Sequence, residues 1–207
     1  MKRTILILLA LAVCTAPAVA SGLYLVTVDT TSLAPGTTGF IDLAFVGGGP
    51  VEATIADFLV TGGSLSGSPS MQGTIGGPLP DTVTMSADNA DYFEGISFGS
   101  SVSFQLTLAG NPIGPGGDTF TLTFFDSTQM FGLLSGNAND LWLVQFQMSA
   151  DGSTTYIAYD NPSGGPSFAN VTSVPEPATA SLAVLVLAGA ALLKTRGRFR
   201  RASRVAA

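Results

Sequence analysis

The chain has 207 residues, of which 14 are acidic and eight basic, with one cysteine and no histidine. All eight basic residues lie near the two ends, so residues 21–174 hold 13 acidic residues (the 14 less Glu176) and no Lys, Arg or His. This interval has no cation with which to neutralise nucleic-acid phosphates. Its composition also excludes catalytic triads built on histidine or cysteine, lysine Schiff-base chemistry, and the usual zinc, copper and haem sites.

Residues 1–20 have the three parts of a secretory signal peptide. A positive Lys2-Arg3 pair precedes an apolar segment, residues 5–13, and the small-x-small cleavage site Ala18-Val19-Ala20. Cleavage after Ala20 would remove Cys14, the only cysteine, and leave the exported protein without a thiol or a disulfide. A lipoprotein signal centred on Cys14 is the alternative, although the bulky residue before it does not suit that motif.

Residues 21–160 are predicted to form an all-β body. Apolar and polar residues alternate over short stretches, as in residues 101–109, and turn-forming Gly and Pro residues separate these stretches. We expect a two-sheet antiparallel sandwich or a jelly-roll-like body. Residues 65–79 are predicted to be a long loop and residues 161–174 a linker. The other predicted strands are residues 23–29, 39–46, 52–60, 81–87, 118–126, 142–148 and 154–159.

One acidic stretch of the body is a candidate site. Asp88, Asp91 and Glu94 lie within seven residues, and their oxygens are ligands of the kind that Ca²⁺ prefers. The same carboxyls could instead be the acid pair of a glycosidase, or polar loop residues that form Asx-turns. A weaker oxygen-rich stretch contains Asn137, Asn139 and Asp140.

Aromatic residues of the body are candidates for stacking against sugar rings. Trp142 alternates with apolar neighbours, which predicts a core position instead, and Tyr156 is predicted to be exposed. An ordinary core or surface role is the alternative for the whole set, which is Tyr92, Phe93, Trp142, Tyr156 and Tyr159.

Residues 175–204, with Val174 before them, form three successive segments. Val174-Pro175-Glu176-Pro177 is predicted to be extended and rigid, because proline fixes φ and removes a backbone donor. Residues 178–193 lack charge and would span roughly 24 Å as a helix, so we predict one C-terminal transmembrane helix in a locally thinned bilayer. The positive-inside rule would keep the following basic tail, residues 194–204, in the cytoplasm. Its basic residues are Lys194, Arg196, Arg198, Arg200, Arg201 and Arg204.

This order of segments resembles the PEP-CTERM sorting signal of bacterial exported proteins. The resemblance implies recognition by a membrane-embedded exosortase, cleavage near residues 174–177, and release to the cell surface or extracellular matrix in association with exopolysaccharide or biofilm. Residues 24–45 also resemble the start of one subgroup of these proteins, which has no assigned activity. We therefore expect an exported, non-catalytic protein that needs no cofactor. A carbohydrate-binding module, with or without Ca²⁺, is the alternative, and a carboxylate hydrolase is third.

Overall fold

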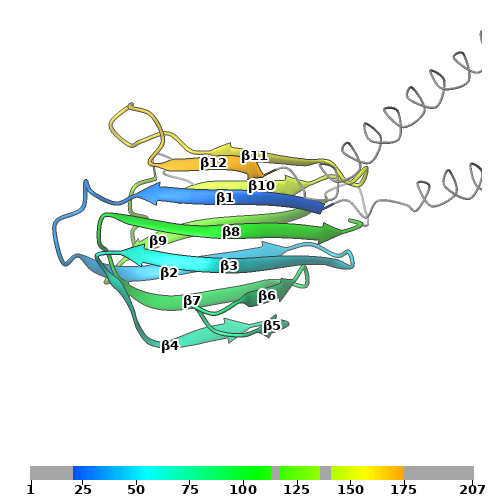
Figure 1. Cartoon of the computed structure of the whole chain (residues 1–207), viewed down its shortest axis with the longest axis horizontal. Helices are drawn as coiled ribbons and strands as arrows, with labels where there is room; N and C mark the ends of the chain where they lie inside the picture. The colour runs from blue at the N-terminus through cyan, green and yellow to red at the C-terminus, as the bar shows by residue number, and fades with distance from the viewer. Residues whose placement is uncertain (1–20, 113–116, 136–140, 175–207) are drawn as a thin grey trace, which may run out of the picture. The chain divides into compact units, whose positions relative to one another are not determined.

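The computed structural model describes residues 21–112, 117–135 and 141–174 (Figure 1). These residues form twelve strands, and no helix that could cross a membrane occurs among them. The chain divides into two compact units between Ser173 and Val174. The predicted signal peptide, Pro175-Glu176-Pro177, the helix over 178–193 and the basic tail all lie outside the described residues and stay predictions.

The strands form two antiparallel sheets of six strands each. Sheet A has the order β12-β1-β8-β3-β6-β5, with bounds β1 Ser21–Asp29, β3 Val51–Thr61, β5 Ile75–Gly76, β6 Val83–Ser86, β8 Ser101–Gly110 and β12 Ala169–Val174. Sheet B has the order β11-β10-β9-β2-β7-β4, with bounds β2 Thr38–Val46, β4 Ser64–Gln72, β7 Ala90–Ser97, β9 Asp118–Asp126, β10 Val144–Met148 and β11 Thr154–Ala158.

The apolar faces of the two sheets form one core, which makes the body sandwich-like. In β8 every second residue is buried, as the alternation in the sequence predicted, and β2 has the same pattern. Sheet A contributes Phe104 and Leu106, and sheet B contributes Phe45, Phe120 and Phe146, all nearly inaccessible to solvent. Burying such side chains contributes about 1.5–3 kcal/mol each and is the main force that holds the sheets together. The predicted all-β antiparallel class is therefore confirmed.

Two predicted connections were wrong. Residues 65–79, predicted as a loop, contain the edge strand β4 and the short strand β5. β4 is exposed at most of its positions, so it needs no apolar alternation, and its pairing with β7 shifts between Ser66 and Ser70, an irregularity that edge strands tolerate. The predicted linker 161–174 ends in β12, an edge strand of sheet A, so the body extends beyond residue 160.

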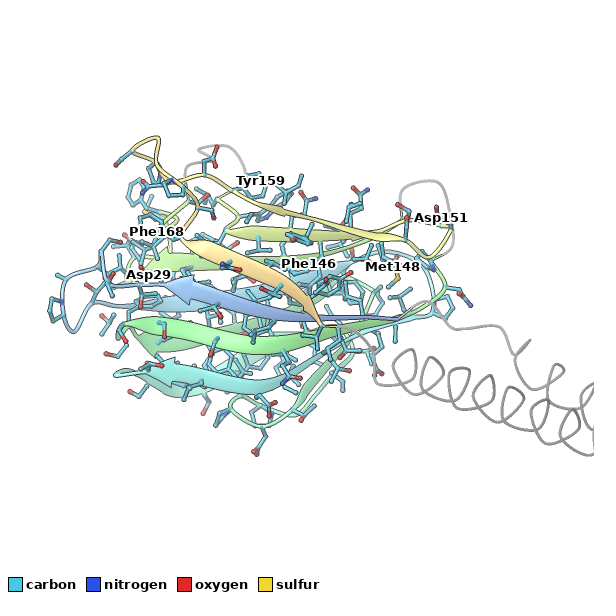
Figure 2. All side chains as sticks on the ribbon, turned by 45° about the horizontal axis from the view of Figure 1, so that its top comes forward. Asp29, Phe146, Met148, Asp151, Tyr159 and Phe168 are labelled. Carbon is cyan, nitrogen blue, oxygen red and sulfur yellow. The ribbon has the colours of Figure 1, made fainter. Side chains whose placement is uncertain are left out.

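β12 begins beside the end of β1. Figure 2 shows Phe168 next to Asp29, and the Asp29 backbone N–H donates to the Phe168 carbonyl at 2.9 Å. Farther along β12, the Tyr156 hydroxyl of β11 donates to the Val171 carbonyl at 3.3 Å, and the Tyr156 ring lies 6.1 Å from that of Tyr24 in β1. β12 therefore runs back along β1, so that its C-terminal end lies beside the first residues of β1.

Candidate functional site

The structure separates the three carboxyl groups that were predicted to bind Ca²⁺. Asp88 precedes β7 and accepts a hydrogen bond from the Thr74 hydroxyl at 2.8 Å. Asp91 and Glu94 are three residues apart in β7, so their side chains point to opposite faces of sheet B. The described part of the chain holds no group of three or more His, Cys, Asp or Glu that could bind a metal ion. The calcium hypothesis for these residues was therefore wrong, and so was the hypothesis of an acid pair made of Asp91 and Glu94.

Glu94 points inward and belongs to a buried hydrogen-bond chain. The Leu79 backbone N–H donates to the Tyr92 hydroxyl at 2.9 Å, and this hydroxyl donates to Glu94 Oε2. Burial raises the pKa of Glu94, an effect that the hydrogen bond from Tyr92 partly offsets. Tyr92 is fully buried and cannot meet a sugar, so the structure supports the core role, the alternative kept open for this residue. The chain of bonds ties the segment before β6 to β7.

Asp91 points outward and meets a different carboxyl, that of Asp42 in β2. In the β2–β7 register Asp42 lies opposite Phe93 and Ala44 lies opposite Asp91, which makes the two acids diagonal neighbours on one face. Burial, followed by the charge of Asp91 and a hydrogen bond with it, raises the pKa of Asp42 to about 7. Both side chains are half-buried, and Oδ1 of each accepts no hydrogen bond from the described residues.

Three phenylalanine rings gather beside this carboxyl pair. Phe40 of β2 and Phe93 of β7 stack with their ring centroids 4.8 Å apart, and Phe125 of β9 lies 6.1 Å from Phe93. All three rings are half-buried on the outer face of sheet B. Phe93 was a predicted aromatic candidate, whereas the sequence analysis did not select Phe40 or Phe125.

A second aromatic pair lies toward the β10–β11 side of the same sheet. The rings of Trp142 and Tyr159 are 6.3 Å apart, and the Tyr159 hydroxyl donates to Gln145 Oε1 at 2.8 Å. Figure 2 shows Tyr159 beyond the end of β11 that lies opposite Asp151. Trp142 is half-buried rather than part of the core, which corrects the prediction for this residue. Tyr156 is 44 % exposed, as predicted, but on the other face of β11.

Strand register aligns these residues in rows across the outer face of sheet B. The rows are Gln145–Thr121–Ala44–Asp91–Gln72, Thr123–Asp42–Phe93–Ser70, and Phe125–Phe40–Gly95–Ser66. Thr121 and Thr123 are buried in these rows, so the accessible part of the face combines aromatic rings and carboxyl groups with the amides and hydroxyls of Gln145, Gln72, Ser70 and Ser66. The outer face of the central strands of sheet A differs in having aliphatic and polar but no aromatic side chains at the described positions Leu23, Leu25, Thr27, Ser103, Gln105, Thr107, Glu52, Thr54 and Ala56. The outer face of sheet B is the candidate functional site.

The second oxygen-rich stretch stays a prediction. Asn137, Asn139 and Asp140 lie outside the described residues.

Comparison of the chain with protein-family models, curated proteins and solved structures finds no match.

Proposed function

We propose that the protein is an exported, non-catalytic component of the cell surface or extracellular matrix, sorted by a C-terminal PEP-CTERM signal and processed by an exosortase. One structural observation supports this proposal above others. The interval between the two predicted cleavage sites, residues 21–174, contains twelve strands that pair into two sheets around one core. Cleavage at the two predicted sites would therefore leave all twelve strands intact.

The course of β12 supports the same proposal. Because β12 runs back along β1, the chain enters and leaves sheet A at the same end. The two predicted cleavage sites, before Ser21 and after Val174, therefore border the same end of sheet A.

We also propose that the body is a jelly roll. In sheet A β1 pairs with β8 and β3 with β6, while in sheet B β2 pairs with β7. These nested pairs of an early strand with a late one are the pattern expected of jelly rolls, a fold used by lectin and capsid domains. The strands β9, β10 and β11 then extend sheet B beyond the eight-stranded unit.

Processing can be tested by replacing the two prolines of the motif. In the native host, Pro175→Ala with Pro177→Ala should leave uncut protein in the membrane, because the segment no longer holds an extended conformation. Mass spectrometry of the exported fraction of the unmodified protein should find no peptide from residues 194–204. Pro162→Ala with Pro166→Ala is the matched control and should be processed normally. Peptides that contain Arg198 in the exported fraction would refute the processing hypothesis.

Carbohydrate binding is the second candidate function, and the outer face of sheet B favours it. Half-exposed rings next to amide and hydroxyl groups are the surface on which proteins hold sugars, since the rings pack on C–H faces and the polar groups bind hydroxyls. The Trp142–Tyr159 pair with Gln145 is the most complete example on this face.

Tyr156 in β11 and Tyr159 directly after β11 provide a matched test of binding. Tyr159 lies on the candidate face and Tyr156 on the opposite face. Tyr159→Ala should weaken binding of the exported protein to its host polysaccharide by about 0.5–1.5 kcal/mol, a loss of roughly two- to tenfold, measured by affinity electrophoresis. Tyr156→Ala should change it little. Equal effects of the two substitutions, or no binding by the unmodified protein, would reject this site.

A further inference from the structure

The charge of the body restricts the class of polysaccharide that the candidate face can bind. Residues 21–174 contain no Lys, Arg or His, so they offer no cation to a uronate, sulfate or phosphate group. Their 13 acids would repel such groups. An acidic polysaccharide is therefore a poor ligand, whereas a neutral or amine-bearing one is compatible with the charge.

The position of the carboxyl pair favours an amine-bearing polysaccharide over a neutral one. Asp42 and Asp91 lie in the middle of sheet B, on β2 and β7, and not in a turn where water would surround them. Phe93 lies directly opposite Asp42 and stacks on Phe40, so apolar rings border the half-buried carboxyls. No cationic side chain of residues 21–174 neutralises these two neighbouring acids. An ammonium group would neutralise them and would gain a charge-assisted hydrogen bond and contact with the rings.

Neighbouring positions suit the rest of a sugar unit. Gln72 lies opposite Asp91, and Ser70 lies opposite Phe93, both exposed in the edge strand β4. Gln145 occupies the same row as Asp91 on the far side of β2 and β9. Exposed amide and hydroxyl groups of β4 thus flank the carboxyl pair on one side, where sugar hydroxyls would lie. On the other side Thr121 and Thr123 of β9 are buried, and Gln145 lies beyond Thr121.

We propose that the outer face of sheet B binds a polysaccharide with protonated amino groups, in which an ammonium contacts Asp42 and Asp91 and the sugar ring packs beside Phe93. This inference rests on the second proposed function, carbohydrate binding by this face, and specifies its ligand class.

The test compares three oligosaccharides of equal length by isothermal titration calorimetry with the exported protein. Glucosamine oligomers should bind at least about tenfold more tightly than N-acetylglucosamine oligomers, because acetylation removes the charge and leaves the rest of the sugar in place. Uronate oligomers should not bind. Equal affinity for the first two would overturn the inference but leave carbohydrate binding intact, whereas absence of binding to any oligosaccharide would reject both.

Variants that lack one acid distinguish binding at the carboxyl pair from attraction to the net negative charge of the protein. Asp42→Asn and Asp91→Asn preserve side-chain shape and should abolish the preference for glucosamine oligomers. Asp81→Asn makes the same change in net charge at an exposed residue before β6 of sheet A, and it should keep the preference. Thermal melting of each variant confirms that it is folded. An equal loss in all three variants, or equally tight binding of oligolysine, would show attraction to the net charge alone and would overturn the inference.

Discussion

The exported protein should become more stable as the pH falls from about 8 to about 5. The pKa of Asp42 is raised from 3.8 to about 7 by burial and by Asp91. Between these two values the folded protein binds a proton that the unfolded chain does not, so the free energy of unfolding increases as the pH falls. The slope approaches about 1.4 kcal/mol per pH unit, and the gain amounts to about 3 kcal/mol. This stability is fully present below the unfolded pKa and is lost as the pH rises through 7. Glu94, whose pKa is also raised, acts in the same direction.

Three aspartates, two at strand ends and one in a turn, oppose this effect at lower pH. Hydrogen bonds from Thr31, Thr128 and Ser153 lower the pKa values of Asp29, Asp126 and Asp151, respectively. A carboxyl with a lowered folded pKa contributes stability above its unfolded pKa, and that contribution disappears as the pH falls through the folded value. Stability should therefore pass through a maximum at about pH 4–5 and decrease in stronger acid.

Chemical denaturation at several pH values measures the effect of Asp42 directly. In the unmodified protein the denaturation midpoint at about pH 5 should exceed that at pH 8. Asp42→Asn should raise the midpoint at pH 8 and flatten the dependence above pH 5, because it removes one charge of the pair. Asp81→Asn, at an exposed position, should retain the dependence. A midpoint that is the same at pH 5 and pH 8 in the unmodified protein would contradict the assignment of Asp42.

Local sequence patterns predicted the central strands because these strands bury every second residue. β8 lies between β1 and β3, and its buried positions are all apolar, so the period of two is complete. β4 lies at the edge of sheet B with most positions exposed, so no such period exists to detect. β12 has one buried residue, Ala169, and was predicted as a linker for the same reason.

β7 was missed for a different reason. Its inner face contains Glu94 beside Tyr92, and its outer face contains Phe93 beside Asp91, so both faces mix charged and aromatic residues. This pattern resembles a polar loop when each residue is judged by type alone. The buried bond between Tyr92 and Glu94 is what permits a carboxyl on the inner face, and its geometry depends on Leu79, which is distant in sequence.

The candidate site depends on strand pairing that the sequence does not determine. Asp91 was recognised as a candidate, but its partner Asp42 lies in β2 and meets it only through the β2–β7 register. A shift of this register by one residue would place one of the two acids on the opposite face. Phe40 and Phe125 likewise come together because β2 pairs with β7 on one side and β9 on the other. Residue types alone identified Phe93, Trp142 and Tyr159.

Replacing Tyr92 with phenylalanine should reduce the free energy of unfolding by about 2–4 kcal/mol. The substitution keeps the ring but removes the hydroxyl that accepts a hydrogen bond from the Leu79 N–H and donates one to Glu94. Both partners would then be buried without this bond, and a buried polar group that loses its partner costs about 1–3 kcal/mol. Urea denaturation provides the measurement, and Tyr156→Phe is the control, since its hydroxyl is exposed at 3.3 Å from the Val171 carbonyl.

Glu94→Gln distinguishes the loss of a hydrogen bond from the cost of a buried charge. The amide oxygen can still accept from Tyr92, while the charge that burial disfavours is gone, so this variant should be at least as stable as the unmodified protein at pH 8. In the double variant Tyr92→Phe with Glu94→Gln, the change in the free energy of unfolding should differ from the sum of the two single changes, because the two residues share one hydrogen bond. The difference, which is the coupling energy, should be about 0.5–3 kcal/mol. Strict additivity, or an unchanged stability of Tyr92→Phe, would mean that the hydroxyl does not hold the segment before β6 against β7.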